Sequence, residues 1–188
     1  MPRLLLHDTP LDGVRVVERQ PLADGRGVFA RLFCTQELAA AGWMQPLAQV
    51  NHSSSARAAT VRGLHWQRAP HAEMKLVSCL HGAVWDVALD LRPGSPTYLQ
   101  WHGETLSADN HRAMLIPEGC AHGFQSLTDG AELLYCHSAA YAGLFEEGVD
   151  PLDAELGIRW PLPVPVAVLS PRDAALPSLA ALRRRWCA

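Results

Sequence analysis

Residues 62–75 bring together side chains that can transfer protons and hold negative charge. Within these fourteen residues lie the guanidinium of Arg62, the imidazole of His65 and the ammonium of Lys75. An imidazole acts as a base near neutral pH, and the two cations can hold an anionic group or stabilise an oxyanion. The alternative is a strand edge with solvated charges and a histidine packed in the core, and for one histidine alone that alternative is the better supported.

A second segment, residues 117–122, has the spacing Pro-x-Gly-x-x-His. This spacing resembles the second motif of the cupin superfamily, and Gly63, His65 and Glu73 lie roughly where the first motif is expected. Metal-binding cupins carry His-x-His and a following Glu in the first motif, and this chain lacks His-x-His. We therefore expect no metal. Taken without its context, His122 is better explained as a hydrogen-bonded turn residue.

The composition limits the range of partners and locations. The 188 residues are enough for one domain spanning residues 1–188. The formal net charge is -3 and the basic residues are scattered, so we expect neither nucleic acid nor a membrane surface as a partner. Five cysteines without paired spacing favour free thiols in the cytoplasm. No apolar run approaches the ~20 residues needed to cross a bilayer.

Short apolar segments separated by turn residues predict an all-β fold. Many short strands at this spacing favour an antiparallel sandwich or barrel, which we interpret as a jelly roll with short flanking helices. Strands are expected at residues 14–17, 28–33, 97–102, 112–116, 123–127 and 133–138. Helices are expected at residues 36–41, capped by Thr35 and ended by Gly42, and at 179–186. Residues 49–52 lead into the polar run 53–57, which predicts a mobile loop, either folded over a ligand or simply on the surface.

Residues 74–80 and 83–90 predict a β-hairpin with His81 and Gly82 as its turn. This register places Lys75 opposite Ala88 and on the same face as Asp86. The other face is apolar, so it must pack on another sheet or on a second subunit.

Several longer motifs occur in order between about Gly13 and Asp173. They read Arg-Gly-Leu-His-Trp-Gln (62–67), Lys-Leu-Val (75–77), Trp-Asp-Val-Ala (85–88), Ser-Pro-Thr (95–97), Ile-Pro-Glu-Gly-Cys-Ala-His-Gly-Phe (116–124) and Leu-Ser-Pro-Arg-Asp (169–173). Together they resemble the dTDP-4-dehydrorhamnose 3,5-epimerase family. The resemblance implies a cupin-fold homodimer, without metal or cofactor, that epimerises a nucleotide diphosphate 4-keto-6-deoxyhexose at C3 and/or C5, the carbons beside the ketone.

The resemblance also implies roles for single residues. His65 matches the family's base and Asp173 the carboxylate that orients it. Lys75 matches the amine that stabilises the enolate oxygen, Tyr135 the proton donor and Tyr141 a second active-site tyrosine. Residues expected to contact the substrate are Arg26, Arg31, Gln49, Asn51, Arg62, Asp86, His122, Glu146 and Arg172.

These residues also have structural explanations. Residues 170–173 fit an N-cap Ser, a Pro at the first helical position and an acid at the third, a capping box that needs no catalysis. Tyr135 and Tyr141 fit core aromatics with satisfied hydroxyls. Gln49 and Asn51 fit turn residues, and Asp86 fits an ion pair with Lys75. The common order of the motifs favours the functional interpretation.

Two positions depart from the family pattern. The strand after Asp24-Gly25-Arg26-Gly27 usually reads Phe-x-Glu-x-Phe in the family, with a Glu that reaches the nucleotide base across the dimer, and here Arg31 replaces that Glu. An acceptor thus becomes a cationic donor, which leaves thymidine, cytidine and guanosine diphosphate sugars open. Arg172 replaces a Lys. The alternative functions are a non-catalytic nucleotide-sugar-binding cupin, suggested by Arg31, and a metal-dependent cupin oxygenase, suggested by the many histidines.

Overall fold

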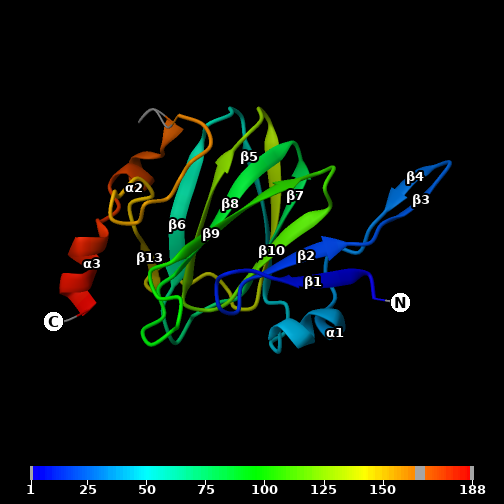
Figure 1. Ribbon diagram of the computed structural model, residues 1–188. Helices are drawn as coiled ribbons and strands as arrows, with labels where there is room; N and C mark the ends of the chain where they lie inside the picture. The colour runs from blue at the N-terminus through cyan, green and yellow to red at the C-terminus, as the bar shows by residue number, and fades with distance from the viewer. Residues whose placement is uncertain (1, 164–167, 187–188) are drawn as a thin grey trace.

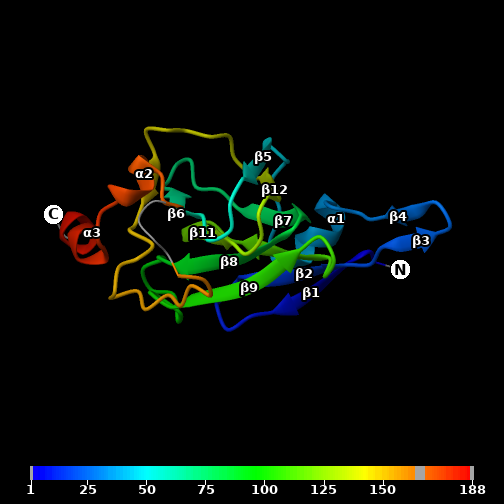
Figure 2. The same cartoon turned by 90° about the horizontal axis from the view of Figure 1, so that it is seen from above.

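Two antiparallel sheets face each other in the computed structural model, which describes residues 2–163 and 168–186 (Figures 1 and 2). The first sheet has the order β1 (Leu4–Asp8), β2 (Arg15–Arg19), β10 (Arg112–Ile116), β7 (Lys75–His81), β12 (Ala131–His137) and β5 (Gln49–Ser55). The second has the order β13 (Glu146–Gly148), β6 (Val61–Gln67), β11 (Cys120–Ser126), β8 (Ala83–Asp90) and β9 (Trp101–Ser107). The predicted all-β jelly roll is confirmed.

The remaining elements lie at the two ends of the sheets. A short hairpin, β3 (Leu22–Asp24) and β4 (Gly27–Phe29), projects from one end, and α2 (Pro171–Ala174) and α3 (Leu179–Trp186) lie at the other (Figure 1). Between them in sequence, α1 (Thr35–Leu38) continues into η1 (Ala39–Ala41), and Gly42 ends this helix at a φ of 90°. The N-cap is Cys34 rather than the predicted Thr35. None of the described helices is long and apolar enough to cross a membrane.

Apolar side chains fill the space between the sheets and cover both outer faces. The inner cluster joins Val77 and Met114 of the first sheet to Val84 and Phe124 of the second. On the outer face of the second sheet, Val87, Leu89 and Leu64 pack under Leu179 and Leu182 of α3. On the outer face of the first sheet, Leu76 and Leu115 pack with Leu38 and Trp43. Strands with apolar residues on both faces are thus buried within one chain.

The predicted hairpin of residues 74–90 is wrong. β7 pairs with β10 and β12, whereas β8 pairs with β9 and β11, so the two strands belong to different sheets. The link at Gly82, with a φ of 67°, is a corner at which the chain passes from one sheet to the other. Each strand is central in its sheet, and a turn signature alone does not distinguish a hairpin from such a corner. Lys75 therefore lies beside Ile116 and His137 instead of Ala88.

Residues 49–55 form strand β5, which includes residues 53–55 of the loop predicted at 53–57. They pair with β12 along their whole length, from Gln49 opposite His137 to Ser55 opposite Ala131. β5 is an edge strand, with one face largely exposed and the other lining a polar cavity. Its residues are therefore polar, and the sequence lacks the apolar alternation that predicts a strand. Other predicted elements also differ from the structure. β1 was not predicted, β4 ends at Phe29 instead of residue 33, and β9 begins at Trp101 instead of residue 97. The predictions for residues 112–116 and 179–186 are confirmed.

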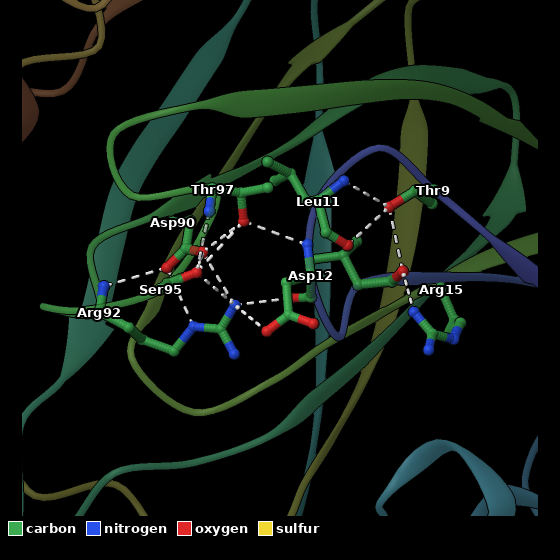
Figure 3. Close-up of polar contacts among 9 residues, drawn as sticks. Thr9, Leu11, Asp12, Arg15, Asp90, Arg92, Ser95 and Thr97 are labelled. Carbon is green, nitrogen blue, oxygen red and sulfur yellow. Dashed lines mark hydrogen bonds and ion pairs between the residues drawn. The ribbon is translucent and has the colours of Figure 1, made fainter.

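The buried carboxylate of Asp90 links the loop that follows β8 to the loop that precedes β2 (Figure 3). Asp90 accepts hydrogen bonds from Arg92 at 2.9 and 2.8 Å, from the Ser95 hydroxyl at 2.5 Å and from the Thr97 hydroxyl at 2.7 Å. Arg92 also donates to the carbonyl oxygen of Asp12, so the loop before β2 joins the network. Burial raises the pKa of Asp90, but the hydrogen bonds from Arg92 and the two hydroxyls have a larger and opposite effect, so the pKa falls to about 2.

We expect Asp90→Asn to lower the free energy of unfolding at pH 7 by about 2 kcal/mol, the value of a carboxyl pKa depressed from near 4 to near 2. Because the folded-state pKa is lowered, this contribution is present above the unfolded-state pKa and is lost as the pH falls toward 2. Urea unfolding at pH 7 and at acidic pH measures both effects. The control is Asp8→Asn, which removes an exposed ion pair with Arg15. A loss for Asp90→Asn that does not change with pH would contradict this explanation.

Candidate active site

A cavity of about 620 Å³ opens between the two sheets. Its walls come from β5, β6, β7, β11 and β12, and α2 closes one side. Eleven of the residues predicted from the sequence line it: Gln49, Asn51, Arg62, His65, Lys75, His122, Tyr135, Tyr141, Glu146, Arg172 and Asp173. Asp86 lies beneath His122, and Arg26 and Arg31 lie elsewhere.

A β-bulge in β6 directs both Arg62 and His65 into this cavity. His122 of β11 lies opposite His65, but Phe124 lies opposite Arg62, so the register shifts by one residue between the two pairs. In a regular strand, side chains three positions apart point to opposite faces. The bulge requires Gly63, which has a φ of 104° and whose missing Cβ would lie 2.6 Å from the carbonyl oxygen of His122. Any other residue there would separate the strands.

His65 and Asp173 form a hydrogen-bonded pair. Nε2 of His65 lies 2.9 Å from Oδ1 of Asp173, and the other carboxylate oxygen accepts from the backbone N–H of Gly63. Burial raises the pKa of Asp173, but the hydrogen bond and charge of His65 outweigh it, so the pKa lies below its usual value. The ionised carboxylate accepts a hydrogen bond from Nε2–H and leaves Nδ1 as the nitrogen that can take a proton.

The capped helix α2 positions Asp173 within hydrogen-bonding distance of His65. Ser170 is the N-cap of α2, with Pro171 at the first helical position, and its hydroxyl accepts from the backbone N–H of Asp173 at 3.0 Å. The structural explanation of these residues is therefore correct for Ser170 and Pro171. The acid at the third position does not complete a capping box, because its carboxylate turns toward β6.

Lys75 is a nearly buried cation in the wall formed by β7. Its ammonium donates to the carbonyl oxygen of His65 at 3.2 Å and pairs with Glu73 at 3.1 Å. Asp86 is hydrogen-bonded to His122 instead, at 2.7 Å between Oδ1 and Nε2. Burial raises the pKa of Asp86, and its Oδ2 finds no hydrogen-bond partner within the described residues. The direct pair between Asp86 and Lys75, which was the alternative structural explanation of Asp86, does not form among the described residues.

The two tyrosines have different environments. Tyr135 is held in β12, where its ring packs edge-on against His122 and its hydroxyl lies 3.2 Å from that of Ser53. Burial raises its pKa, so the phenol keeps its proton. Tyr141 is exposed and donates its hydroxyl proton to Glu146 at 2.7 Å. That hydrogen bond raises the pKa of Tyr141.

Polar contacts connect the exposed Tyr141 to strand β5 in the cavity wall. Glu146 also forms an ion pair with Arg172 at 2.5 Å, and the backbone N–H of Tyr141 donates to Gln49 at 2.9 Å. Gln49 in turn donates to Asn51 on the same strand. Gln49 and Asn51 are thus residues of strand β5 that face the cavity, not the turn residues of the alternative explanation.

Arg26 and Arg31 lie outside the cavity of this chain. Arg26 is at the tip of the β3–β4 hairpin, 91% exposed, and pairs with Asp24. Arg31 forms an ion pair with Glu37, whose carboxylate also accepts from the backbone N–H groups of Arg3 and Leu4. Arg31 is therefore paired within its own chain. Their assignment as substrate contacts stays a prediction.

Glu73 and His137 also line the cavity, although neither was predicted as a site residue and Glu73 had been noted only for its position in the first cupin motif. Their side chains pair at 3.1 Å beside Lys75. The available signal was strand alternation, because His137 follows Tyr135 by two positions on β12. For residues 2–163 and 168–186, no three His, Cys, Asp or Glu side chains converge as a metal site.

Comparison with known proteins gives the family of this chain. The family model described as dTDP-4-dehydrorhamnose 3,5-epimerase matches residues 8–181. The dTDP-4-dehydrorhamnose 3,5-epimerase of Streptomyces griseus is 42% identical over 176 residues, which are 93% of this chain and 86% of that protein. The chain belongs to the dTDP-4-dehydrorhamnose 3,5-epimerase family. The resemblance found in the sequence motifs is thereby confirmed.

Two further relatives show the range within the family. The dTDP-4-dehydrorhamnose 3-epimerase of Streptomyces niveus is 44% identical and covers 87% of this chain and 78% of its own length. A crystal structure of the Bacillus anthracis dTDP-4-dehydrorhamnose 3,5-epimerase, with TDP and PPi bound, superposes with a TM-score of 0.89 at 39% identity. It covers 94% of this chain and 99% of its own. The fold is therefore that of the cupin epimerases.

We expect Ser170→Ala to lower the free energy of unfolding by about 1 kcal/mol, because the first turn of α2 loses its cap. The same change should shift the NMR signals of the His65 ring, because α2 positions Asp173. The control is Ser178→Ala at the start of α3, where the hydroxyl accepts from the N–H of Ala181. That variant should lose similar stability and leave the His65 signals in place. Identical His65 spectra in both variants would contradict a positioning role for Ser170.

Proposed function

We propose that this chain epimerises a dTDP-linked 4-keto-6-deoxyhexose at C3 and/or C5, through an enolate that is reprotonated on the opposite face. One observation carries the proposal: the candidate base and the candidate acid come from facing sheets. His65 is on β6 of the second sheet and Tyr135 on β12 of the first, and both line the cavity. A sugar ring between them can lose a proton on one face and gain one on the other.

His65 removes the proton beside the ketone. Nε2 is occupied by Asp173, so Nδ1 takes the proton, and the carboxylate stabilises the imidazolium that forms. The pair needs no rearrangement, because α2 and the N–H of Gly63 already hold the carboxylate in place. Proton abstraction by a positioned base contributes about a hundredfold to ten-thousandfold to a rate.

Lys75 stabilises the enolate and Tyr135 returns the proton. Negative charge develops on the ketone oxygen, and a nearly buried ammonium interacts with it more strongly than an exposed one would. Tyr135 is suited to donation because its raised pKa keeps the phenol protonated until a strong base, the enolate carbon, is present. Tyr141 lies at the rim, where its hydroxyl bonds to Glu146. We assign it to the substrate-binding wall with Arg172.

The names of the relatives support a dTDP sugar as substrate, but they leave open whether epimerisation occurs at C3 alone or at both C3 and C5. The Streptomyces griseus protein is named a 3,5-epimerase and the Streptomyces niveus protein a 3-epimerase, at similar identity to this chain. The crystal structure from Bacillus anthracis contains TDP. The positive charge of Arg31 is no argument against a thymidine nucleotide, because Glu37 neutralises that charge.

We also propose a cytoplasmic location for the protein, because Cys34, Cys79, Cys120 and Cys136 are free thiols.

We further propose a homodimer, on evidence different from that of the sequence. The apolar faces of β7 and β8 are covered within the chain and need no partner. The β3–β4 hairpin, by contrast, stands away from the sheets and exposes Leu22, Val28 and Phe29, the last at 73% (Figure 1). A two-stranded hairpin with exposed apolar residues is marginal alone, so a second copy of the chain is the expected cover.

Light scattering after size-exclusion chromatography should give twice the chain mass. Phe29→Asp should shift the protein toward the monomer, because a charge would replace an apolar contact in the interface. Leu152→Asp, a change at another exposed leucine outside the hairpin, is the control and should leave the mass unchanged. A monomeric wild-type protein would overturn the dimer.

Incubation in D2O with dTDP-4-keto-6-deoxyglucose tests the reaction itself. We expect deuterium at C3, or at C3 and C5, with slower exchange for the CDP and GDP analogues. His65→Asn should slow exchange by about a hundredfold or more, because the base is removed. His7→Asn, which alters a surface histidine paired with Glu18, should have no effect. No exchange with any of the three nucleotides would overturn the proposed reaction and favour a binding protein without turnover.

A further inference from the structure

Glu73 connects three side chains in the wall of the cavity. One carboxylate oxygen lies 3.1 Å from the ammonium of Lys75, and the other accepts from Nδ1 of His137 and from the amide of Gln67, each at 3.1 Å. The side chains of Glu73, Lys75 and His137 are all at least nine-tenths buried. None of the steps proposed above uses Glu73 or His137.

The carboxylate limits the orientation of the Lys75 ammonium. An ammonium has three donors and no acceptor. One donor goes to the carbonyl oxygen of His65, and the ion pair with Glu73 holds a second side of the ammonium, which leaves its third side for the substrate. Without Glu73, the ammonium would be free to rotate about its last bond and would lose this alignment.

The same carboxylate selects one tautomer of His137. Because Glu73 accepts at Nδ1, the neutral ring carries its proton there, and Nε2 can accept from the amide of Asn51, 3.4 Å away. The ring of His137 also stacks on Tyr135, with centroids 6.0 Å apart and an interplanar angle of 18°. Glu73 thus acts on both the enolate-stabilising cation and the ring beside the proton donor.

Gln67 extends the connection to the segment that carries Tyr141. Its amide nitrogen donates to Glu73 and to the carbonyl oxygen of Ala140 at 3.3 Å, and its oxygen accepts from the backbone N–H of Ala142 at 2.5 Å. The backbone on both sides of Tyr141 is therefore connected to the Glu73 carboxylate through the amide of Gln67. Burial raises the pKa of Glu73, but His137 and Lys75 outweigh this effect, so the pKa is lowered and the carboxylate is ionised at neutral pH.

We propose that Glu73 is a positioning residue of the epimerisation, which aligns Lys75 toward the enolate oxygen and holds His137 as the Nδ1–H tautomer against Tyr135. The proposal rests on the proposed function for the identity of the reaction. It extends that function because Glu73 touches none of the reacting atoms and acts through Lys75 and His137. Its contribution therefore belongs to turnover more than to substrate binding.

Glu73→Gln tests this role with a side chain of the same length. A glutamine has one acceptor oxygen, so it cannot satisfy both the ammonium of Lys75 and Nδ1–H of His137. We expect kcat to fall about tenfold to a hundredfold, as for loss of a charged hydrogen bond, with a change in KM of less than about threefold. Nitrogen-15 NMR of labelled histidines should show the Nδ1–H tautomer of His137 in the wild-type protein and its loss in the variant.

Glu132→Gln is the matched control. Glu132 also pairs with a histidine, His52, at 3.1 Å, but both side chains are exposed. That variant should keep kcat, KM and the His137 tautomer. The positioning role is overturned if Glu73→Gln keeps both kcat and the tautomer, or if it lowers kcat no more than Glu132→Gln does. If the wild-type protein turns over no nucleotide sugar, the proposed function fails, and the tautomer then decides the role of Glu73 by itself.

Discussion

The close approach of β6 and β11 at Gly63 is the constraint on which the candidate site depends. A Cβ at this position would lie 2.6 Å from the carbonyl oxygen of His122, and the backbone has a φ of 104°. The bulge that results places Arg62 and His65 on the same side of the strand and aims the N–H of Gly63 at Asp173. The proposed anion contact, the proposed base and the orientation of that base therefore all depend on one residue without a side chain.

The two sheets divide the chemistry between them. The second sheet carries two imidazoles with carboxylate partners, His65 with Asp173 of α2 and His122 with Asp86 of β8. The first sheet carries Lys75 and the phenol of Tyr135, together with the polar edge strand β5. Because rigid strands on facing layers hold the reacting groups, their separation is set by the packing of the apolar core and not by a loop.

The sequence predicted best where local pattern and motif order agree. Residues 112–116 form the expected strand, and most predicted site residues line one cavity. The partner strands of β7 and β8 were missed, because sheet pairing is decided by contacts distant in sequence. Strand β5 was missed because an edge strand with a polar cavity face lacks apolar alternation. Glu73 and His137 act as a pair only in the folded chain, and no spacing reveals a pair 64 residues apart.

The balance of charge in the cavity indicates where an anionic group binds. Most cationic or imidazole side chains that line it have a carboxylate partner: Lys75 with Glu73, Arg172 with Glu146, His65 with Asp173, His122 with Asp86 and His137 with Glu73. Arg62 differs. Within the part of the chain that the structure describes, its guanidinium bonds only to the hydroxyl of Ser55 and the carbonyl oxygen of Ser54, which are neutral. In the proposed reaction, a diphosphate that enters the cavity can therefore pair with Arg62 without displacing a carboxylate, while the ammonium of Lys75 is left for the enolate oxygen.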